Sequence, residues 1–308
     1  MARISLFTAL LLAAVLAIAG CSGLSSASGS GQPPPPTAQA DHVFLVVLEN
    51  HSFGQVVGNP VMPFLNSLAT QHSMAANYFA DAHPSIPNYF MMSTGDLQTF
   101  DDNFSGTISA DNLVRSLTGA KKTWKVYAEG LPSVGYTGPS VGTYLRRHNP
   151  FSFLSDVTGD RAQAANMVPF SQFSSDLNAG TLANFVYLLP DRQQDAHDCP
   201  NGAPTCPDND KLAAADNWLQ ANIGPLLSSP NFGNSVLIIT FDESISTDLT
   251  NGGGQVLTVL AGPHVKTGFS STTLFQHQSV LRLILQLLSA TDMPGASANA
   301  NAMGEFFQ

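Results

Sequence analysis

A serine bracketed by prolines is the strongest chemical signal in this 308-residue sequence. Ser85 stands between Pro84 and Pro87 in the stretch 81–89, which reads DAHPSIPNY. Proline is favoured in the first turn of a helix, because its missing N–H has no intrahelical partner there. We therefore expect a helix to begin near Pro87, to end at Gly95, and to carry Ser85 at or near its N-cap.

Two interpretations of Ser85 follow from this position. A serine at an N-cap accepts hydrogen bonds from the helix backbone, so the residue can be purely structural. The same place lies in the positive field of the helix N-terminus, which stabilises an alkoxide and a bound phosphate. The position alone supports both interpretations equally.

Acidic, amide and histidine side chains follow three separate apolar runs. Glu49 and Asn50 follow the first run, and Asp242 and Glu243 follow the last. The group between them consists of Asp191, Asp195, His197 and Asp198. Open α/β sheets place their sites beyond the C-terminal ends of the strands, so we expect these groups at one rim of a sheet. Acidic residues at strand ends also serve as turn formers, which is the competing interpretation of each group taken alone.

The elements that must position these residues alternate between strand-like and helix-like segments. Segments typical of strands occupy residues 43–48, 122–128, 184–189, 236–241 and 256–261. Helical spacing occurs at 63–72, 210–223 and 278–288. This alternation predicts an α/β fold with a mostly parallel central sheet and helices on both faces.

The first forty residues predict export rather than part of the fold. Residues 1–20 hold one Arg and a long apolar run, which is typical of a secretory signal peptide. Cys21 follows small residues as in a bacterial lipobox, so we expect a lipid anchor there; an ordinary signal peptide with an incidental cysteine is the alternative. Residues 21–40, rich in Ser, Gly and Pro, predict a disordered tether. Residues 41–308 then form a single domain, lipid-anchored at the bacterial cell envelope or secreted.

Charge and cysteine usage narrow the partners and the compartment. The chain has 12 Lys and Arg against 22 Asp and Glu, a formal net charge of −10. Non-specific nucleic-acid binding needs a basic surface, so we expect no nucleic-acid partner. Cys199 and Cys206 flank a turn-rich segment, and in an exported protein they predict a disulfide over two free thiols. The oligomeric state is left open.

Three motifs in order resemble one family. The stretch HPSIPNY, preceded by LENHSF and followed by TFDES, is similar to the phosphoesterase family of bacterial acid phosphatases and phosphatidylcholine-type phospholipases C. That family has the alkaline-phosphatase-like superfold. The resemblance spans residues 42–290 and implies metal-dependent hydrolysis of phosphate esters through a phosphoserine intermediate at Ser85.

Carried onto this sequence, the resemblance implies one divalent metal ion and a set of oxygen ligands. The ligands are Glu49, Asn50, Ser85, Asp242 and Glu243. Oxygen ligands suit Mg, Ca, Mn or Zn, so the identity of the ion stays open. Two-zinc members of the superfold also have a histidine shortly after the acidic pair, where this chain has Ser244. The departure favours one metal over two.

The resemblance also implies contacts to the substrate. His197 is expected to protonate the leaving oxygen or to bind phosphate, and a solvent-facing loop histidine is the alternative. His148, in a segment similar to the H-N-P-F element of the family, is expected to bind phosphate oxygens, with Glu129 orienting it. A loop cation and a strand-end acid are equally good interpretations of these two. Asn88, close to Ser85 in the same motif, is also expected to bind substrate.

Other functions would require different sequence features. A serine esterase needs a G-x-S-x-G elbow, whereas Ser85 sits between prolines. Phospholipases C of the family are longer than this chain, which favours a compact acid-phosphatase-like enzyme acting on small phosphate esters. A phosphodiesterase or phospholipase C acting on lipid head groups remains the alternative within the class. A surface lipoprotein that binds without turnover is the alternative outside it.

Overall fold

A sheet of eight strands organises residues 39–308, the part of the chain that the computed structural model describes. The predicted signal peptide at 1–20, the predicted lipidation at Cys21 and nearly all of the predicted tether lie outside the described residues. Within residues 39–308, no helix combines the length and the apolar character that a membrane crossing requires.

The strand order of the sheet is β5-β4-β6-β1-β7-β8-β2-β9. The strands are β1 (His42–Leu48), β2 (Ser73–Ala75), β4 (Trp124–Ala128), β5 (Met167–Pro169), β6 (Phe185–Leu189), β7 (Ser235–Phe241), β8 (Thr258–Ala261) and β9 (Phe269–Ser271). All pairs from β5 to β7 are parallel, whereas β8 runs antiparallel to both of its neighbours. The short strands β3 (Tyr78–Phe79) and β10 (Phe275–Gln276) pair separately. The predicted mostly parallel α/β fold is confirmed.

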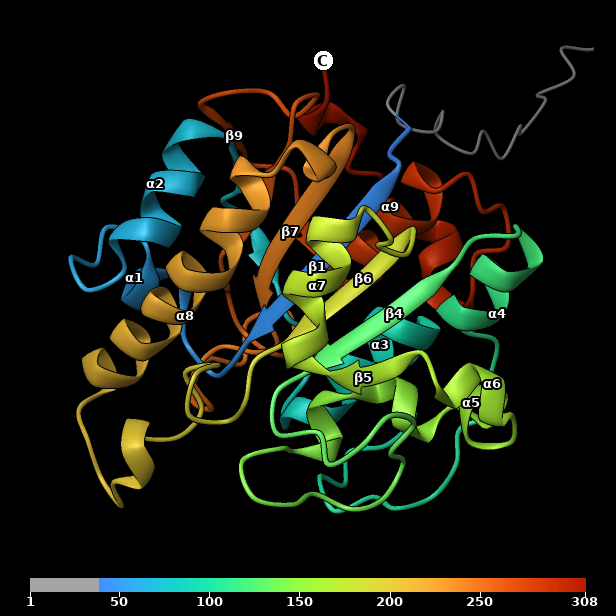
Figure 1. Cartoon of the computed structure of the whole chain (residues 1–308). Coiled ribbons are helices and arrows are strands. Elements are labelled where there is room, and N and C mark those ends of the chain that lie inside the picture. The colour runs from blue at the N-terminus through green and yellow to red at the C-terminus, as the bar shows by residue number, and fades with distance from the viewer. Residues whose placement is uncertain (1–38) are drawn as a thin grey trace, which may run out of the picture. The chain divides into compact units, whose positions relative to one another are not determined.

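Helices cover both faces of this sheet. They are α1 (Phe53–Val56), α2 (Pro63–Gln71), α3 (Ser85–Thr94), α4 (Leu113–Gly119), α5 (Ser155–Thr158), α6 (Arg161–Ala164), α7 (Phe173–Ala179), α8 (Asp208–Ser228) and α9 (His277–Leu287). Figure 1 shows α7 and α8 in front of the strands and α3, α4 and α9 behind them. The central strands therefore have two covered faces, which explains their continuous apolar sequences.

The register between the central strands sets the position of the acidic residues. Leu48, the last residue of β1, pairs with Phe241, the last residue of β7. The residues that follow are therefore neighbours, and the N–H of Asp242 donates to the carbonyl of Leu48 at 2.8 Å. The N–H of Glu49 donates to the carbonyl of Asp195, beyond the end of β6, at 2.8 Å. Three strand ends thus meet at one edge of the sheet.

The predicted elements agree with the observed ones to within about three residues at most ends. Helix α3 begins at Ser85, two residues earlier than the predicted start, and ends before Gly95, whose φ of 71° is the left-handed conformation that glycine adopts readily. The sequence reading missed β2, β5 and β9, because runs of three residues are too short to show a strand period.

Candidate active site

Ser85 opens α3 and faces two carboxylates. Its hydroxyl lies 3.1 Å from Glu49 Oε2 and 3.3 Å from Glu243 Oε1, and the residue is only 4 % exposed. The N-cap is Pro84, and the Ser85 hydroxyl caps no backbone group of the helix. A hydroxyl has one proton, so Oγ can donate to only one of its two carboxylate neighbours at a time. Because the Ser85 hydroxyl contacts carboxylates and no helix backbone group, Ser85 is not a capping residue.

The carboxylates around Ser85 are buried together. Glu49 and Asp242 are fully buried, and Glu243 is nearly so. Burial, followed by the charge of Asp242, holds the pKa of Glu49 well above its usual range. Burial raises the pKa of Asp242 to about 7, and burial with the neighbouring Asp242 raises that of Glu243 to about 9. Desolvation disfavours a charged carboxylate, so this cluster requires protons or a cation.

Asn50 ties two of these carboxylates together. Its backbone N–H donates to Asp242 Oδ1 at 3.0 Å, and its side-chain Nδ2 donates to Glu49 Oε2 at 2.6 Å. The φ of Asn50 is 59°, in the left-handed region that asparagine tolerates better than most residues. Asp242 Oδ2 is buried and has no hydrogen-bond partner among the described residues. Asn50 thus occupies Oδ1 of Asp242, and Oδ2 remains as an acceptor without a hydrogen-bond partner among the described residues.

His148 lies between two carboxylates. Its Nε2 is 3.2 Å from Glu49 Oε1 and its Nδ1 is 3.0 Å from Asp195 Oδ2. The ring stacks on Tyr89 at a centroid distance of 5.3 Å, and the Tyr89 hydroxyl donates to Glu49 Oε1. Burial, with the nearby charge of Arg147, holds the pKa of His148 well below its usual range. The ring is therefore fixed in place and is disfavoured as an imidazolium.

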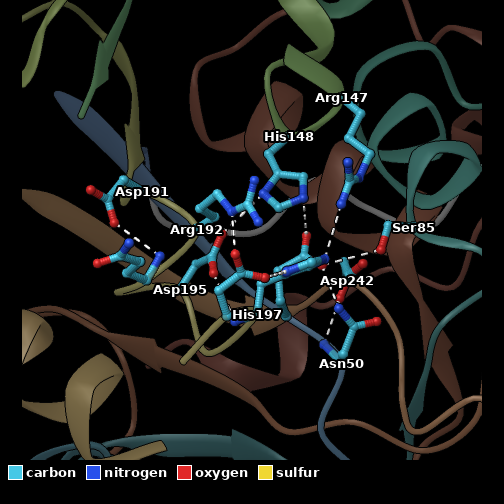
Figure 2. A network of polar contacts seen from close by, with 12 residues as sticks. Asn50, Ser85, Arg147, His148, Asp191, Arg192, Asp195, His197 and Asp242 are labelled. Carbon is cyan, nitrogen blue, oxygen red and sulfur yellow. Dashed lines mark hydrogen bonds and ion pairs between the residues drawn. The ribbon is translucent and has the colours of Figure 1, made fainter. Parts of the chain in front are cut away.

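His197 is fixed at both ring nitrogens but remains half-exposed. Nδ1 lies 2.6 Å from Asp198 Oδ1, and Nε2 lies 2.9 Å from Nη2 of Arg147. A guanidinium can only donate, so Nε2 is the acceptor in this arrangement and the ring proton is on Nδ1. The His197 N–H donates to Asp195 Oδ1 at 2.8 Å. Figure 2 shows Arg147, His148 and His197 converging on the same side of the site as Asp242 and Ser85.

The donor atoms fit a divalent cation. The orphaned Asp242 Oδ2 and the crowded oxygens of Glu49, Ser85 and Glu243 form a set of hard oxygen donors. A second candidate group, which shares Glu49, combines it with His148 and His197, whose ligand atoms all lie within 4.8 Å of one another. His197 Nε2 accepts from Arg147, whereas His148 Nε2 lies 3.2 Å from Glu49 Oε1 without forming a hydrogen bond. The described residues therefore contain a candidate metal-binding cluster centred on Glu49.

Two predicted substrate contacts have other roles. Asn88 is fully buried, and its amide bonds only to backbone, accepting from Asp81 and Ala82 and donating to Ala82 and Pro84. It fixes the segment before Ser85 and has no atom free for a substrate. Glu129 accepts from the N–H of Asp191 at 3.0 Å, and the partner of His148 Nδ1 is Asp195. The predicted orientation of His148 by Glu129 was therefore wrong.

The sequence analysis left several contacting residues without a role. Tyr89 and Arg147 reach the site because α3 and the turn Arg146–His148 lie against one another beside it, which no local pattern reveals. His83 Nδ1 lies 2.6 Å from Glu243 Oε2, so it pairs with the carboxylate that also faces Ser85. The sequence offered a signal for Asp195, among the acids after a strand, and for His83, two residues before Ser85 in the same motif.

The predicted cysteine pair lies in the loop after His197. Cys199 and Cys206 form a disulfide, with their Cα atoms 5.7 Å apart. The bridge closes the loop that connects the His197 segment to α8, and Cys199 itself is buried. It therefore anchors the chain immediately beyond a candidate catalytic histidine.

A mostly parallel sheet that presents a helix-borne serine among buried carboxylates at its C-terminal edge defines a hydrolase with the alkaline-phosphatase-like fold. Solved structures agree at the level of the fold. A protein of the alkaline phosphatase superfamily from Vibrio parahaemolyticus matches 83% of this chain and 68% of its own, with a TM-score of 0.56 and 13% identity. A lipoteichoic acid synthase from Listeria monocytogenes matches 85% and 76%, with a TM-score of 0.57 and 14% identity.

The sequence comparisons identify the family. The profile of the phosphoesterase family matches residues 59–289, so the chain belongs to this family and is a phosphoric ester hydrolase. A phosphatidylinositol-3-phosphatase of Mycobacterium tuberculosis is 33% identical over 80% of this chain and 76% of its own length. An acid phosphatase of Aspergillus fumigatus is 30% identical over 84% of this chain, and the match spans 58% of the fungal protein. The chain thus covers little more than half of this fungal relative.

Proposed function

We propose that the protein hydrolyses phosphate monoesters as an acid-phosphatase-like enzyme, with Ser85 as the nucleophile. The observation that carries the proposal is the placement of the Ser85 hydroxyl within 3.1 and 3.3 Å of two buried carboxylates at a helix start. Similarity to proteins named acid phosphatase and phosphatidylinositol-3-phosphatase supports the monoester class. Phosphoryl transfer demands mainly alignment and charge stabilisation, which a rigid, buried cluster of this kind provides.

One divalent cation is part of the proposal. Glu49, Asn50, Ser85, Asp242 and Glu243 would hold it. When bound, such an ion lowers the pKa of a hydroxyl and neutralises charge on a phosphoryl group. The orphaned Oδ2 of Asp242 and the raised pKa values of the three acids support this assignment, because a cation would stabilise all of their charged forms at once.

In the first half of the reaction, different residues accept and donate the two protons that move. Ser85 Oγ attacks phosphorus and loses its proton to a neighbouring carboxylate, Glu243 or Glu49, while the ester oxygen leaves. His197 gives the leaving oxygen a proton from Nε2, which requires both ring nitrogens to be protonated. Asp198 Oδ1, 2.6 Å from Nδ1, holds the ring in this orientation. Arg147, released from Nε2, is then free to bind phosphate oxygens through its guanidinium.

The second half returns the enzyme to its starting state. Water attacks the phosphoserine, and its proton passes to His197 Nε2. Ser85 Oγ leaves phosphorus and recovers the proton held by the carboxylate. Tyr89 and Asn50 keep Glu49 in place throughout through their hydrogen bonds, and His148 stacks on Tyr89.

The test is replacement of the nucleophile. In Ser85→Ala we expect the hydrolysis of p-nitrophenyl phosphate to fall by about 10³-fold or more, and acid quenching with labelled substrate to trap phosphoserine in the wild type only. The matched control is Ser93→Ala, a buried serine of the same helix whose hydroxyl contacts only the backbone of Phe90. Wild-type activity in Ser85→Ala would refute the proposed nucleophile.

We further propose that the enzyme works outside the cytoplasm on a lipid anchor at Cys21. The signal-like first twenty residues and the Cys199–Cys206 disulfide support export, because disulfides persist in oxidising compartments. In a bacterial host we expect labelled palmitate to be incorporated into the wild type and not into Cys21→Ala. Equal labelling of the two chains would contradict the anchor.

A further inference from the structure

A hollow of about 420 Å³ lies beside His197 and is not used by the phosphoryl chemistry. One wall is the disulfide-closed loop, through Cys199, Gly202 and Pro204. The remaining wall includes Arg192, His197 and Lys211. This volume lies within the range of about 300–1,000 Å³ that small-molecule sites occupy. The hollow is therefore large enough for a small organic molecule.

The hollow is cationic on a protein that is otherwise acidic. Arg192 and Lys211 are two of only 12 Lys and Arg in a chain of net charge −10. Asp198, the one carboxylate of the lining, already accepts from Arg192 Nε and lies 2.6 Å from His197 Nδ1. Within the part of the chain that the structure describes, Lys211 forms no ion pair. The lining thus contains two cationic side chains and one carboxylate, and the ammonium of Lys211 has no ion-pair partner among the described residues.

Hydrogen bonds fix the backbone that carries two of the lining residues, Arg192 and Lys211. The Arg192 N–H donates to the carbonyl of Thr143 at 3.2 Å. Lys211 is half-buried in the first turn of α8, and that turn is fixed by hydrogen bonds from Gln55 to Asp208 and from Asn59 to Asn209. Because the backbone of this turn is fixed, only the Lys211 side chain has to be ordered when a ligand binds, which limits the entropic cost.

The position of His197 connects the hollow to the reaction. His197 lines the hollow, and its ring centroid is 5.6 Å from that of His148, which in turn lies beside Glu49. Figure 2 shows His197 between Ser85 and Arg192 in this view. Because His197, Arg192 and Lys211 line the same hollow, a leaving group whose oxygen faces His197 has room beside the two cationic side chains.

We propose that this hollow is the leaving-group subsite and that it selects phosphate monoesters whose leaving group has a second anionic group, a carboxylate or a phosphate. The inference rests on the proposed function, because it takes His197 as the residue that faces the leaving oxygen. Lys211 and Arg192 supply the attraction, and the disulfide-closed loop supplies the wall. Lys211 is the specificity-determining residue of the pair, since Arg192 is already engaged by Asp198.

The experiment compares two open-chain esters that differ mainly in leaving-group charge, glucitol 6-phosphate and 6-phosphogluconate. We expect the wild type to have the higher kcat/KM for 6-phosphogluconate. In Lys211→Met this preference falls about fivefold, the size of one partly exposed charge interaction, with most of the change in KM. Lys211→Arg retains the preference, because it keeps the charge. Added salt reduces the preference in the wild type, since an exposed charge is screened.

The matched control is Lys122→Met, also half-buried but placed ahead of β4 at the opposite edge of the sheet. Its preference stays at the wild-type value. A second measurement uses gluconate as an inhibitor of p-nitrophenyl phosphate hydrolysis: it inhibits the wild type more strongly than glucitol does, and Lys211→Met removes the difference. An unchanged preference in Lys211→Met overturns the subsite and leaves the proposed function intact. Failure of the wild type to hydrolyse either ester, or full activity in Ser85→Ala, overturns both.

Discussion

Two acidic regions of the molecule use the same residue types in opposite ways. Beside α4, Asp156 accepts from Asn112 Nδ2 at 2.7 Å and from Arg115 Nη2 at 2.9 Å. Burial opposes the charge of Asp156, but these hydrogen bonds outweigh it, and its pKa lies below the usual range. At the sheet edge, Glu49 and Asp242 have raised pKa values. The first region stabilises the fold, and the second costs stability in the absence of a cation.

The difference lies in what faces the carboxylates. In residues 39–308, no Lys or Arg forms an ion pair with Glu49, Asp242 or Glu243. The partners of these acids are each other, the neutral donors of Ser85, Tyr89 and Asn50, and the two histidines His83 and His148. A buried charge without a counterion is expensive and persists where the chemistry needs it. The two regions differ in their counterions: Asp156 has an arginine and a lowered pKa, whereas Glu49, Asp242 and Glu243 have neither a Lys nor an Arg partner in the described part of the chain and have raised pKa values.

The largest expected effect separates activity from stability. Asp242→Asn should lower kcat/KM by about 10²–10³-fold, because a charge that supports phosphoryl transfer is lost. The same change should raise the unfolding free energy of chelated protein at pH 7.5 by about 1–3 kcal/mol, because it removes a buried charge. Enzyme assays and urea unfolding in chelator measure the two quantities.

The control for this prediction is Asp156→Asn. It should leave activity unchanged and lower the unfolding free energy by up to about 1 kcal/mol, since Arg115 is partly exposed and the pair is screened. If Asp242→Asn lowers the unfolding free energy of the metal-free protein, the proposed difference between the two acidic regions is wrong.

The next effect concerns metal binding. Adding a divalent ion at about 100 times its Kd should stabilise the wild type by about 2.7 kcal/mol, which is about 5–10 °C in Tm for a domain of this size. Asp242→Asn should lose most of the shift, and Asp156→Asn should keep it. Thermal melts with chelator and with Mg, Ca, Mn or Zn make the measurement. Equal shifts in wild type and Asp242→Asn would place the ion elsewhere.

The smallest effect concerns how the unfolding free energy depends on pH: Asp156 and Asp242 contribute to it with opposite signs. Asp156 has a lowered folded pKa, so its stabilisation is present above the unfolded value of about 3.9 and is lost as the pH falls through the folded pKa. Asp242 has a folded pKa of about 7, so the favourable contribution of its protonated form is present below about 3.9 and is lost as the pH rises toward 7. Unfolding free energies of chelated wild type and of each Asn variant, measured from pH 3 to 8, isolate the two contributions.

The sequence predicted the strands that matter because they are long and apolar. The runs at 43–48 and 236–241 have no polar residue except Thr240, and they became β1 and β7. The order of those strands also brought Glu49 and Asp242 to one edge, as expected for an open α/β sheet. The antiparallel β8 was not foreseen, because strand direction depends on the path of the connecting chain rather than on any local pattern.

Contacts within the site could be predicted from the sequence only between residues that are adjacent in the chain. Asn50 beside Glu49, and Asp198 beside His197, needed no tertiary information. Glu129 was expected to orient His148, yet Asp195 is the partner of His148 Nδ1, and Glu129 instead accepts from the N–H of Asp191. Asn88 was assigned to substrate for its motif, but its amide is consumed by the backbone of Asp81–Pro84.

The sequence by itself determined the family motifs, the central strands and the start and end of α3 to within two residues, because apolar period, proline and glycine act locally. It also singled out Ser85 and the acidic ends of β1 and β7. Only the tertiary structure decided which acids lack a counterion and that His148 lies beside Glu49, the carboxylate next to Ser85. It also decided that Lys211 lines a hollow beside His197. Desolvation and charge pairing depend on residues far apart in the chain, so burial and register had to be known before the acids of the site could be told from the acids of the surface.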